Sequence, residues 1–339
     1  MKVCIAGCGA IGGLLAARLA TTGAELTVLD RGVRLAALRE RGLRLQDARQ
    51  GTVAVSGLEV TETLAGRGPF DVVFLAVKAH EISAMAATLT AAVGASTTLV
   101  TLQNGIPWWY FQRHGGPLEG TVLESTDPGG QLAALIDPAR IIGCVAYPAA
   151  EVPEPGVVRH IEGSRFPLGE LDGSDSRRAR QLAALLEAAG LKSPVLDDIR
   201  GELWLKAWGN LAFNPISALT HGTMAEIARH PHTRAYTVEL MTEAAQVAEG
   251  LGIRFRVPLE KRLAGAERVG GHRTSMLQDV LDGRPLELDA ILGAVIEMAT
   301  LVGVEAPNLR ALYALVSLRN ATRLAAADNP NGRMECNAA

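Results

Sequence analysis

A glycine-rich turn near the start of the chain restricts its fold more than any other feature. Residues 2–7, KVCIAG, form an apolar run typical of a buried strand, and Gly7, Gly9 and Gly12 follow in a G-x-G-x-x-G spacing. Residues 10–23 then have a helical pattern that ends at Gly23. In such a strand–turn–helix unit each glycine allows a close approach of backbone that a side chain would block. The chain is therefore predicted to begin as a parallel α/β fold.

The same turn predicts a ligand. The N-terminus of the following helix offers unpaired N–H groups and the positive end of the helix dipole, a combination that suits a pyrophosphate. We therefore expect a dinucleotide cofactor here; the alternative is a tight glycine turn without a ligand. The residues expected to contact the cofactor are Gly7, Gly9, Ala10, Ile11 and Gly12.

Strand and helix patterns alternate through the first 105 residues. Strands are predicted at 25–30, 71–78 and 97–105, with a helix near 80–93 and a small β excursion at 42–63. Strands at 140–149, 156–163 and 165–171 and a helix at 176–190 follow. After about residue 199 the pattern is almost entirely helical, at 201–219, 232–252, 258–266, 285–303 and 306–325. The sequence thus predicts a Rossmann-like α/β domain at 1–199, an all-helical domain at 200–328 for substrate and dimer contacts, and a polar tail at 329–339.

The end of the second predicted strand gives conflicting indications of the cofactor. An acidic residue at this place, Asp30, commonly binds the ribose hydroxyls of NAD, whereas a nearby arginine suits the 2′-phosphate of NADP. Arg31 follows Asp30 directly, and Arg34 stands four residues after it. NADP is the expected cofactor through Arg31, and Asp30 leaves NAD as the alternative; the arginines could also belong to a solvated helix start.

Two further polar residues end strands of the predicted sheet. Lys78 closes DVVFLAVK and Asn104 closes the run at 97–105. Because ligands of open α/β sheets bind at the carboxyl ends of the strands, both are expected near the glycine turn. Either residue could instead be a solvated lysine or an asparagine that caps a turn.

A polar row interrupts the apolar helix of the second domain. Lys206, Asn210 and Asn214 stand four residues apart in WLKAWGNLAFNPISAL, so they line one side of a helix. The row is predicted either to be a solvated edge or to face a small polar ligand. Downstream, Ser275 and Asp279 share a helix face, and Glu287 opens the next helix.

Composition excludes several classes of partner. A formal net charge of −3 argues against nucleic acid or an anionic membrane, and the sequence shows no membrane-spanning stretch. The N-terminal apolar run fits the glycine motif better than a signal peptide. The scattered cysteines, Cys4, Cys8, Cys144 and Cys336, fit a reducing cytoplasm. No cluster of histidines and cysteines predicts a metal site.

The chain resembles the ketopantoate reductases (2-dehydropantoate 2-reductases) over most of its length. The similar segments are the GCGAIG turn, the VK strand end, QNG, ELWLKAWGNLAFNPISALT and SMLQDV with the following glutamate. The resemblance implies that Lys206 is the general acid and that Asn210, Asn214 and Ser275 hold substrate oxygens. It implies cofactor-side roles, Asn104 also serving the substrate, for Gly7, Gly9, Gly12, Arg31, Lys78, Asn104 and Glu287.

The residue chemistry agrees with that implication. Reduction of a ketone by hydride builds negative charge on the carbonyl oxygen, which an ammonium group stabilises and protonates. Amides both donate and accept hydrogen bonds, as a hydroxylated keto acid requires. We therefore expect NAD(P)H-dependent reduction of 2-dehydropantoate to (R)-pantoate, on the route to pantothenate. A homodimer is a further expectation.

Two departures from the family pattern keep other functions open. Met224 stands where the family often has a further substrate asparagine, and the segment 106–140 is longer than usual and contains the aromatic run WWYF. That run could be a packed loop, a subunit contact, or a lid that reshapes the pocket. The alternatives are a related reductase of another keto acid or an imine, and a dinucleotide-sensing protein without catalysis.

Overall fold

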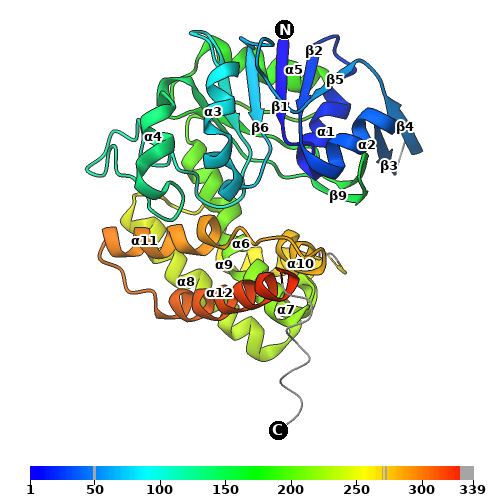
Figure 1. Cartoon of the computed structure of the whole chain (residues 1–339). Coiled ribbons are helices and arrows are strands. Elements are labelled where there is room, and N and C mark those ends of the chain that lie inside the picture. The colour runs from blue at the N-terminus through cyan, green and yellow to red at the C-terminus, as the bar shows by residue number, and fades with distance from the viewer. Residues whose placement is uncertain (49–50, 269, 272, 329–339) are drawn as a thin grey trace. The chain divides into compact units, whose positions relative to one another are not determined.

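The chain forms two compact units, Met1–Glu202 and a second that begins at Leu203. The computed structural model (Figure 1) describes residues 1–48, 51–268, 270–271 and 273–328. The break lies three residues after the predicted boundary, because helix α6 (Ile199–Thr220) starts in the first unit and continues in the second. Cys336 and the predicted tail at 329–339 lie outside the described residues.

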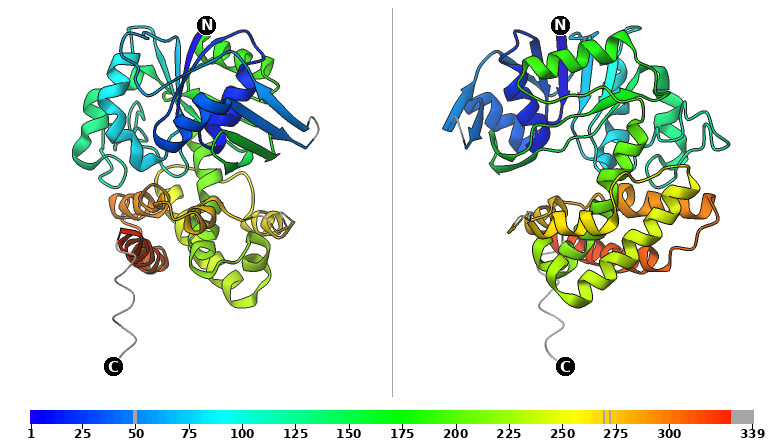
Figure 2. Two further views of the ribbon diagram at one scale, coloured as in Figure 1. Left: turned by 45° about the vertical axis from the view of Figure 1, so that its right-hand side comes forward. Right: turned by 180° about the vertical axis from the view of Figure 1, so that it is seen from behind.

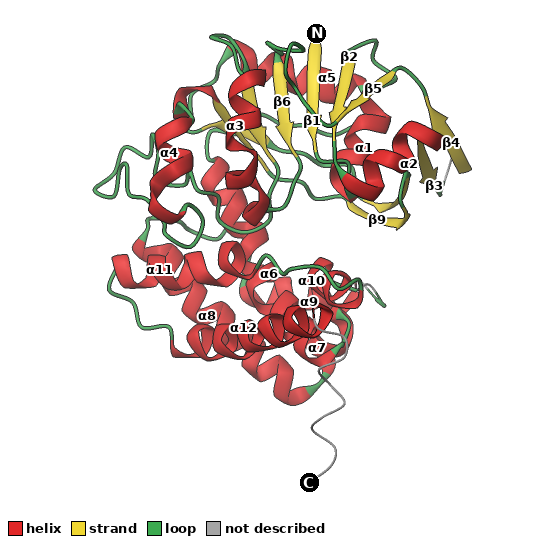
Figure 3. Ribbon diagram, in the orientation of Figure 1, coloured by secondary structure: helices red, strands yellow, loops and turns green. Residues whose placement is uncertain are grey.

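A seven-stranded sheet forms the centre of the first unit (Figure 3). Its order is β11-β8-β7-β6-β1-β2-β5, and all neighbours are parallel except β11 and β8. This arrangement confirms the α/β class predicted from the alternating pattern. The strands are β1 (Lys2–Ala6), β2 (Glu25–Leu29), β5 (Leu58–Thr61), β6 (Val72–Leu75), β7 (Thr98–Thr101), β8 (Ile141–Cys144) and β11 (Leu168–Glu170).

The central strands are continuous apolar runs because both faces of the sheet are covered. Every residue of β6, β7 and β8 is buried. One face shares a core with α1 (Ala10–Leu19) and α5 (Arg177–Ala188), while α3 (Ile82–Ala92) covers the other face (Figure 2). The remaining helical segments of the unit are α2 (Gly32–Arg41), α4 (Gln131–Leu135) and the 3₁₀ turns η1 (Ala79–Glu81), η2 (Pro128–Gly130) and η3 (Pro138–Arg140).

A second, four-stranded sheet packs on the outer side of α1. Its order is β4-β3-β10-β9, from β3 (Leu43–Asp47), β4 (Gly51–Val55), β9 (Ala149–Glu154) and β10 (Val157–Glu162). The close packing needs Gly13, since a Cβ there would lie 2.5 Å from Val158 Cγ2. The β segment predicted at 42–63 therefore contributes to both sheets. Strands β3 and β4 join the four-stranded sheet, whereas β5 extends the seven-stranded one. Strand β9 was not predicted, since the strand expected at 140–149 corresponds to β8 and reaches only the first residue of β9.

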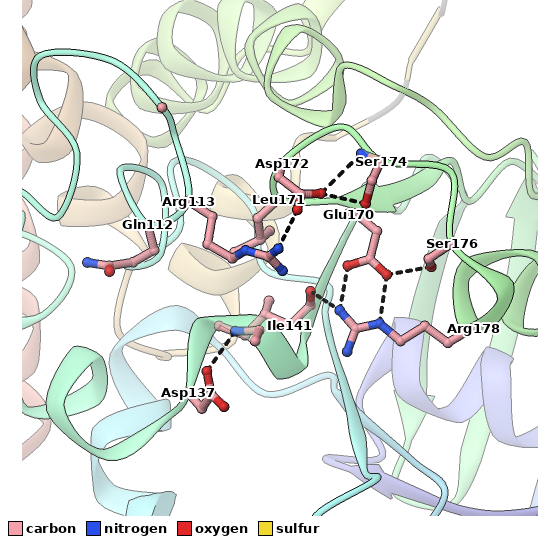
Figure 4. A network of polar contacts seen from close by, with 12 residues as sticks. Gln112, Arg113, Asp137, Ile141, Glu170, Leu171, Asp172, Ser174, Ser176 and Arg178 are labelled. Carbon is pink, nitrogen blue, oxygen red and sulfur yellow. Dashed lines mark hydrogen bonds and ion pairs between the residues drawn. The ribbon is translucent and has the colours of Figure 1, made fainter.

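A buried ion pair holds the edge strand β11 against α5 (Figure 4). Glu170 is 3% exposed and accepts from Arg178 Nε at 2.6 Å and from Ser176 Oγ at 2.5 Å. Ser176 also accepts from Ala179 N at 3.1 Å and so caps α5. Beside it, a side-chain hydrogen bond from Ser174 lowers the pKa of Asp172, which also pairs with Arg113.

The aromatic run at 108–111 is part of the core of the first unit. Trp109, Tyr110 and Phe111 have no exposed surface, and Trp109 Nε1 donates to Thr101 Oγ1 at 3.0 Å. Arg200 in the first turn of α6 donates to the carbonyl oxygens of Tyr110 and Gln112, at 2.7 Å each, and of Leu171. The packed-loop prediction is therefore confirmed, and the idea that these aromatic rings form a lid is wrong.

The second unit is built from helices among its described residues (Figure 1). The long helices agree with the predicted ranges to within a few residues, whereas the short α7 was not predicted. None of the helices in the described ranges is long and apolar enough to cross a membrane. The helical elements are α7 (Met224–Arg229), α8 (Pro231–Gly250), α9 (Leu259–Arg268), α10 (Ser275–Leu281), η4 (Asp289–Gly293), α11 (Ala294–Leu301) and α12 (Pro307–Asp328).

Polar contacts close the ends of these helices. Glu243 of α8 is buried and accepts from the backbone nitrogens of Asn308 and Leu309, at 2.9 Å each, so it caps α12 from another helix. Thr223 and Glu226 form a capping box at the start of α7. These contacts satisfy N–H groups that a helix leaves unpaired at its N-terminus.

Candidate active site

The glycine turn has the geometry that its spacing predicts. Gly7 follows β1 with φ +98°, and a Cβ there would lie 2.7 Å from Val77 Cγ1. A Cβ on Gly12 would lie 1.9 Å from the carbonyl oxygen of Gly7, so no side chain fits at this position. Both glycines are therefore required by the fold of the turn itself.

Gly9 is not required by the fold in the same way. It has an extended backbone with φ −75°, and a Cβ there would meet no atom within 4 Å. No side chain from the described residues caps α1 at this end. A side chain at residue 9 would project into open space at the start of α1, where the N–H groups of the first turn, which begins with Ala10 and Ile11, have no intrahelical partner. The space and these donors fit the pyrophosphate of a dinucleotide.

Asp30 binds to the backbone of the turn. Its buried carboxylate accepts from Cys8 N and Arg31 N at 2.7 Å each, and from Arg34 Nε at 3.2 Å on both oxygens. These three N–H groups, the one from Arg34 shared between both oxygens, use most of the hydrogen-bonding capacity of a carboxylate. Asp30 thus fixes the turn against the end of β2, and Arg34 balances its charge.

The strand ends bring the other predicted cofactor residues to the same edge. Arg31 is 71% exposed at its side chain and pairs with Glu81 at 3.1 Å, and Glu81 accepts from Lys78 N at 3.2 Å. Gln103 Nε2 donates to the carbonyl oxygens of Leu75 and Val77, at 2.7 and 3.1 Å. It therefore ties the end of β6 to the segment that carries the next residue, Asn104.

The predicted polar row lies on α6 in the second unit. Lys206 and Asn210 are half-buried, and Asn214 is 5% exposed. Within the described residues, the amide of Asn214 is not among the enclosed side-chain polar atoms that lack a hydrogen-bond partner. Its neighbours on the helix are firmly held: Trp208 Nε1 donates to the carbonyl oxygen of Met241 at 2.6 Å, and its ring stacks on Phe255 at 4.0 Å.

The two downstream residues differ in their surroundings. Ser275 is exposed at the first position of α10, after the capping residue Thr274. Glu287 is 8% exposed and directly precedes the helical segment that includes η4. Asp279, which shares the face of Ser275, is buried and pairs with Arg284 at 3.0 Å. Asp279 therefore holds the turn after α10.

Two contributors to these arrangements, Glu81 and Gln103, were missed by sequence reasoning. Glu81 pairs with Arg31 and forms a capping box with Lys78, three residues before it, which is a local pattern that could have indicated it. Gln103 had no such pattern, because its partners, Leu75 and Val77, come from another strand end. Arg34 was expected near the 2′-phosphate, and the structure pairs it with Asp30 four residues before it.

The glycine turn at the edge of a parallel sheet defines a Rossmann-type dinucleotide-binding protein. Residues 3–173 match the family described as ketopantoate reductase PanE/ApbA, and residues 198–320 match ketopantoate reductase PanE/ApbA C terminal. The chain belongs to the ketopantoate reductase family.

Individual relatives agree with this assignment. A 2-dehydropantoate 2-reductase of Mesorhizobium japonicum is 48% identical over 93% of this chain and 97% of its own. A solved relative from Ralstonia solanacearum MolK2 has a TM-score of 0.90 at 38% identity, over 95% of this chain and 98% of its own. The 2-dehydropantoate 2-reductase structure from Geobacter metallireducens has a TM-score of 0.83 at 26% identity, over 94% of this chain and 100% of its own.

Proposed function

We propose that the protein reduces 2-dehydropantoate to (R)-pantoate with NADPH. The observation that carries this proposal is the row of Lys206, Asn210 and Asn214 along α6, in a chain that belongs to the ketopantoate reductase family. An ammonium and two amides four residues apart supply the proton donor and the hydrogen-bond donors and acceptors that a hydroxylated keto acid requires. The family membership and the 48% identical reductase support the same substrate.

The residues of the chain have distinct parts in the proposed reaction. The reduced nicotinamide, when bound, supplies the hydride added to C2 of the keto acid. The Lys206 ammonium donates a hydrogen bond to the carbonyl oxygen as charge develops there, and then gives that oxygen its proton. The amides of Asn210 and Asn214 and the hydroxyl of Ser275 hold the other substrate oxygens.

The cofactor side belongs to the first unit in this proposal. Gly7, Gly9 and Gly12, with the N–H groups of Ala10 and Ile11, receive the pyrophosphate at the start of α1. Lys78 and Asn104 serve from the adjoining strand ends. Glu287 either binds a ribose hydroxyl or holds Lys206 in place.

The surroundings of Asp30 support NADPH over NADH. A buried carboxylate that already accepts from three N–H groups on both of its oxygens has little capacity left for the ribose hydroxyls of NADH. Arg34 neutralises the Asp30 carboxylate. The exposed Arg31 can bind a 2′-phosphate in place of its ion-pair partner Glu81. A charge-assisted hydrogen bond contributes about 1.5–3 kcal/mol, enough to select between the two cofactors.

The first test is NADPH and NADH oxidation, followed by absorbance, with 2-dehydropantoate as the ketone. We expect turnover with NADPH and a weaker reaction with NADH. A folded protein that binds NADPH but turns over only other keto acids or imines would contradict the substrate. Cofactor binding without turnover of any of them would favour the dinucleotide-sensing alternative.

Arginine variants test the cofactor choice separately. Arg31→Ala should weaken the binding of NADPH by about tenfold or more and leave the binding of NADH nearly unchanged. Arg39→Ala on the same helix, α2, is the matched control, since it removes an equal charge away from Asp30. Equal losses of NADPH affinity in the two variants would contradict the assignment of Arg31.

Association into a homodimer stays a prediction, which light scattering of the purified protein checks.

A further inference from the structure

One ion pair joins the two strand ends on either side of the glycine turn. The sheet order places β1, which leads into the turn, between β2 and β6 (Figure 1). Arg31 follows β2, Glu81 belongs to η1 after β6, and Arg31 Nη2 lies 3.1 Å from a carboxylate oxygen, Oε1, of Glu81. Gly7 N donates to the carbonyl oxygen of Leu29 at 2.8 Å, so the turn is fastened to the end of β2. The ion pair therefore spans the end of the strand that leads into the proposed cofactor site.

Glu81 is the fixed member of this pair. Its second carboxylate oxygen, Oε2, accepts from Lys78 N at 3.2 Å, and Glu81 N donates to the carbonyl oxygen of Lys78 at 2.9 Å. Glu81 also stands at the N-terminus of α3, where the helix dipole favours a negative charge. Its side chain is 25% exposed, whereas that of Arg31 is 71% exposed. When the pair opens, Arg31 is therefore the side chain that moves, and the Glu81 carboxylate stays in place.

The other arginine at the end of β2 already has a partner of its own. Arg34 Nε donates to both oxygens of Asp30 at 3.2 Å, and the Asp30 carboxylate is buried. A phosphate on the 2′-oxygen of the adenosine ribose therefore draws on Arg31, and Arg31 reaches it only by leaving Glu81. An adenosine ribose without that phosphate, as in NADH, requires no such exchange.

We propose that Glu81 is a specificity-determining residue, which competes with the 2′-phosphate for Arg31 and so narrows the preference for NADPH over NADH. The inference rests on the proposed function, because it takes the dinucleotide to bind at the glycine turn. Binding of NADPH replaces the Glu81 carboxylate by the phosphate as the partner of Arg31 and leaves the two anions near each other, where they repel. Binding of NADH leaves the ion pair intact. The preference for NADPH is therefore the attraction between Arg31 and the phosphate, reduced by the cost of releasing Glu81.

Binding titrations of the full-length Glu81→Gln variant test the proposal. The amide oxygen can still accept from Lys78 N, so the substitution removes the charge and keeps the turn. We expect NADPH to bind at least about threefold more tightly than it does to the wild-type protein, and NADH to bind with unchanged affinity. Adenosine 2′,5′-bisphosphate and 5′-AMP, which differ only in the 2′-phosphate, should show the same contrast. Unchanged or weaker binding of NADPH to the folded variant would overturn the proposal.

Glu154→Gln is the matched control for the loss of one negative charge. Glu154 of β9 pairs with Arg44 at 3.0 Å, so it too belongs to an ion pair of the first unit. Arg44 lies beyond the C-terminal end of α2, whereas Arg31 precedes its N-terminus, and a helix of 10 residues separates the two places by about 15 Å. Salt screens charges at that distance, so neither cofactor should bind differently. An equal gain of NADPH affinity in the control would assign the effect to net charge and overturn the proposal.

A double variant separates competition for Arg31 from direct repulsion of the phosphate. In the Arg31→Ala protein, Glu81→Gln should change the NADPH affinity by less than it does in the wild-type protein, because no guanidinium is left to release. A gain of equal size in both proteins would overturn the competition. These titrations contain no keto acid, so a protein that binds NADPH but does not reduce 2-dehydropantoate contradicts the proposed reaction and leaves the inference about Glu81 to be decided by the affinities. Absence of binding of both cofactors to the wild-type protein would overturn both.

Discussion

The glycine turn of the first unit and the polar row of the second differ in how each would form the ligand site proposed for it. The turn depends on its backbone, because neighbouring atoms leave no room for a side chain at Gly7 or Gly12 and Gly9 leaves space. The row depends on its side chains, because Lys206, Asn210 and Asn214 stand four residues apart on helix α6, which continues through Pro215. A backbone site is therefore damaged by adding atoms, whereas a side-chain site is damaged by removing them.

The largest expected effect comes from removing the amine of the row. Lys206→Ala should lower kcat by about 10²- to 10⁴-fold, because the developing oxyanion loses its proton donor. NADPH affinity, measured by fluorescence titration, should be unchanged. Added alkylamines should restore part of the activity. Wild-type turnover in the alanine variant would remove Lys206 from the reaction.

Adding one methyl group to the turn should have the next largest effect. Gly12→Ala places a Cβ 1.9 Å from the carbonyl oxygen of Gly7, so the helix and the turn must separate. We expect a loss of about 3 kcal/mol or more in the free energy of unfolding, measured by urea denaturation. A change below about 0.5 kcal/mol would mean that the turn relaxes freely.

Gly9→Ala is the matched variant within the same turn. Because a Cβ there meets no atom of the chain, the free energy of unfolding should stay within about 0.5 kcal/mol of wild type. NADPH binding should weaken by about tenfold or more, since the methyl group occupies the space left for the pyrophosphate. Unchanged NADPH affinity would argue against a pyrophosphate at this position.

The smallest expected effect separates stability from activity in the row. Asn214→Leu replaces the amide of a residue that is 5% exposed with an apolar side chain of similar size, so the free energy of unfolding should change by less than about 1 kcal/mol. The kcat/KM for 2-dehydropantoate should nevertheless fall at least about tenfold. Asn210→Leu, at a half-buried position, should lose activity to a similar extent. Marked destabilisation by Asn214→Leu would assign the amide a structural role.

The difference between the two regions also explains what could be predicted from the sequence. The turn, the alternating strands and the long helices follow from local patterns, and the structure agrees with them. Sheet partners do not: nothing local distinguishes β5, which joins the main sheet, from β3 and β4, which do not. The six-residue α7 is too short to show a helical period.

Side-chain surroundings were the least predictable feature. The conflict between Asp30 and Arg31 in the sequence arises because one partner of the Asp30 carboxylate, Cys8 N, comes from another strand end, although its other partners lie nearby in the chain. The burial of Trp109 and Tyr110 depends on Arg200, ninety residues away from Tyr110 along the chain. The roles of Lys206, Asn210 and Asn214 came from spacing together with resemblance, because the same spacing also suits a solvated edge.

The continuity of α6 across the boundary at Glu202 restricts how such a chain can be recombined. Many multidomain proteins are joined by exposed linkers, which proteases cut and gene fusions can exchange. Here a cut at the boundary would divide a 22-residue helix next to Leu203 and Trp204, both buried. A chimaera that pairs this cofactor-binding half with another reductase's helical half must therefore match the two sequences turn by turn within one helix.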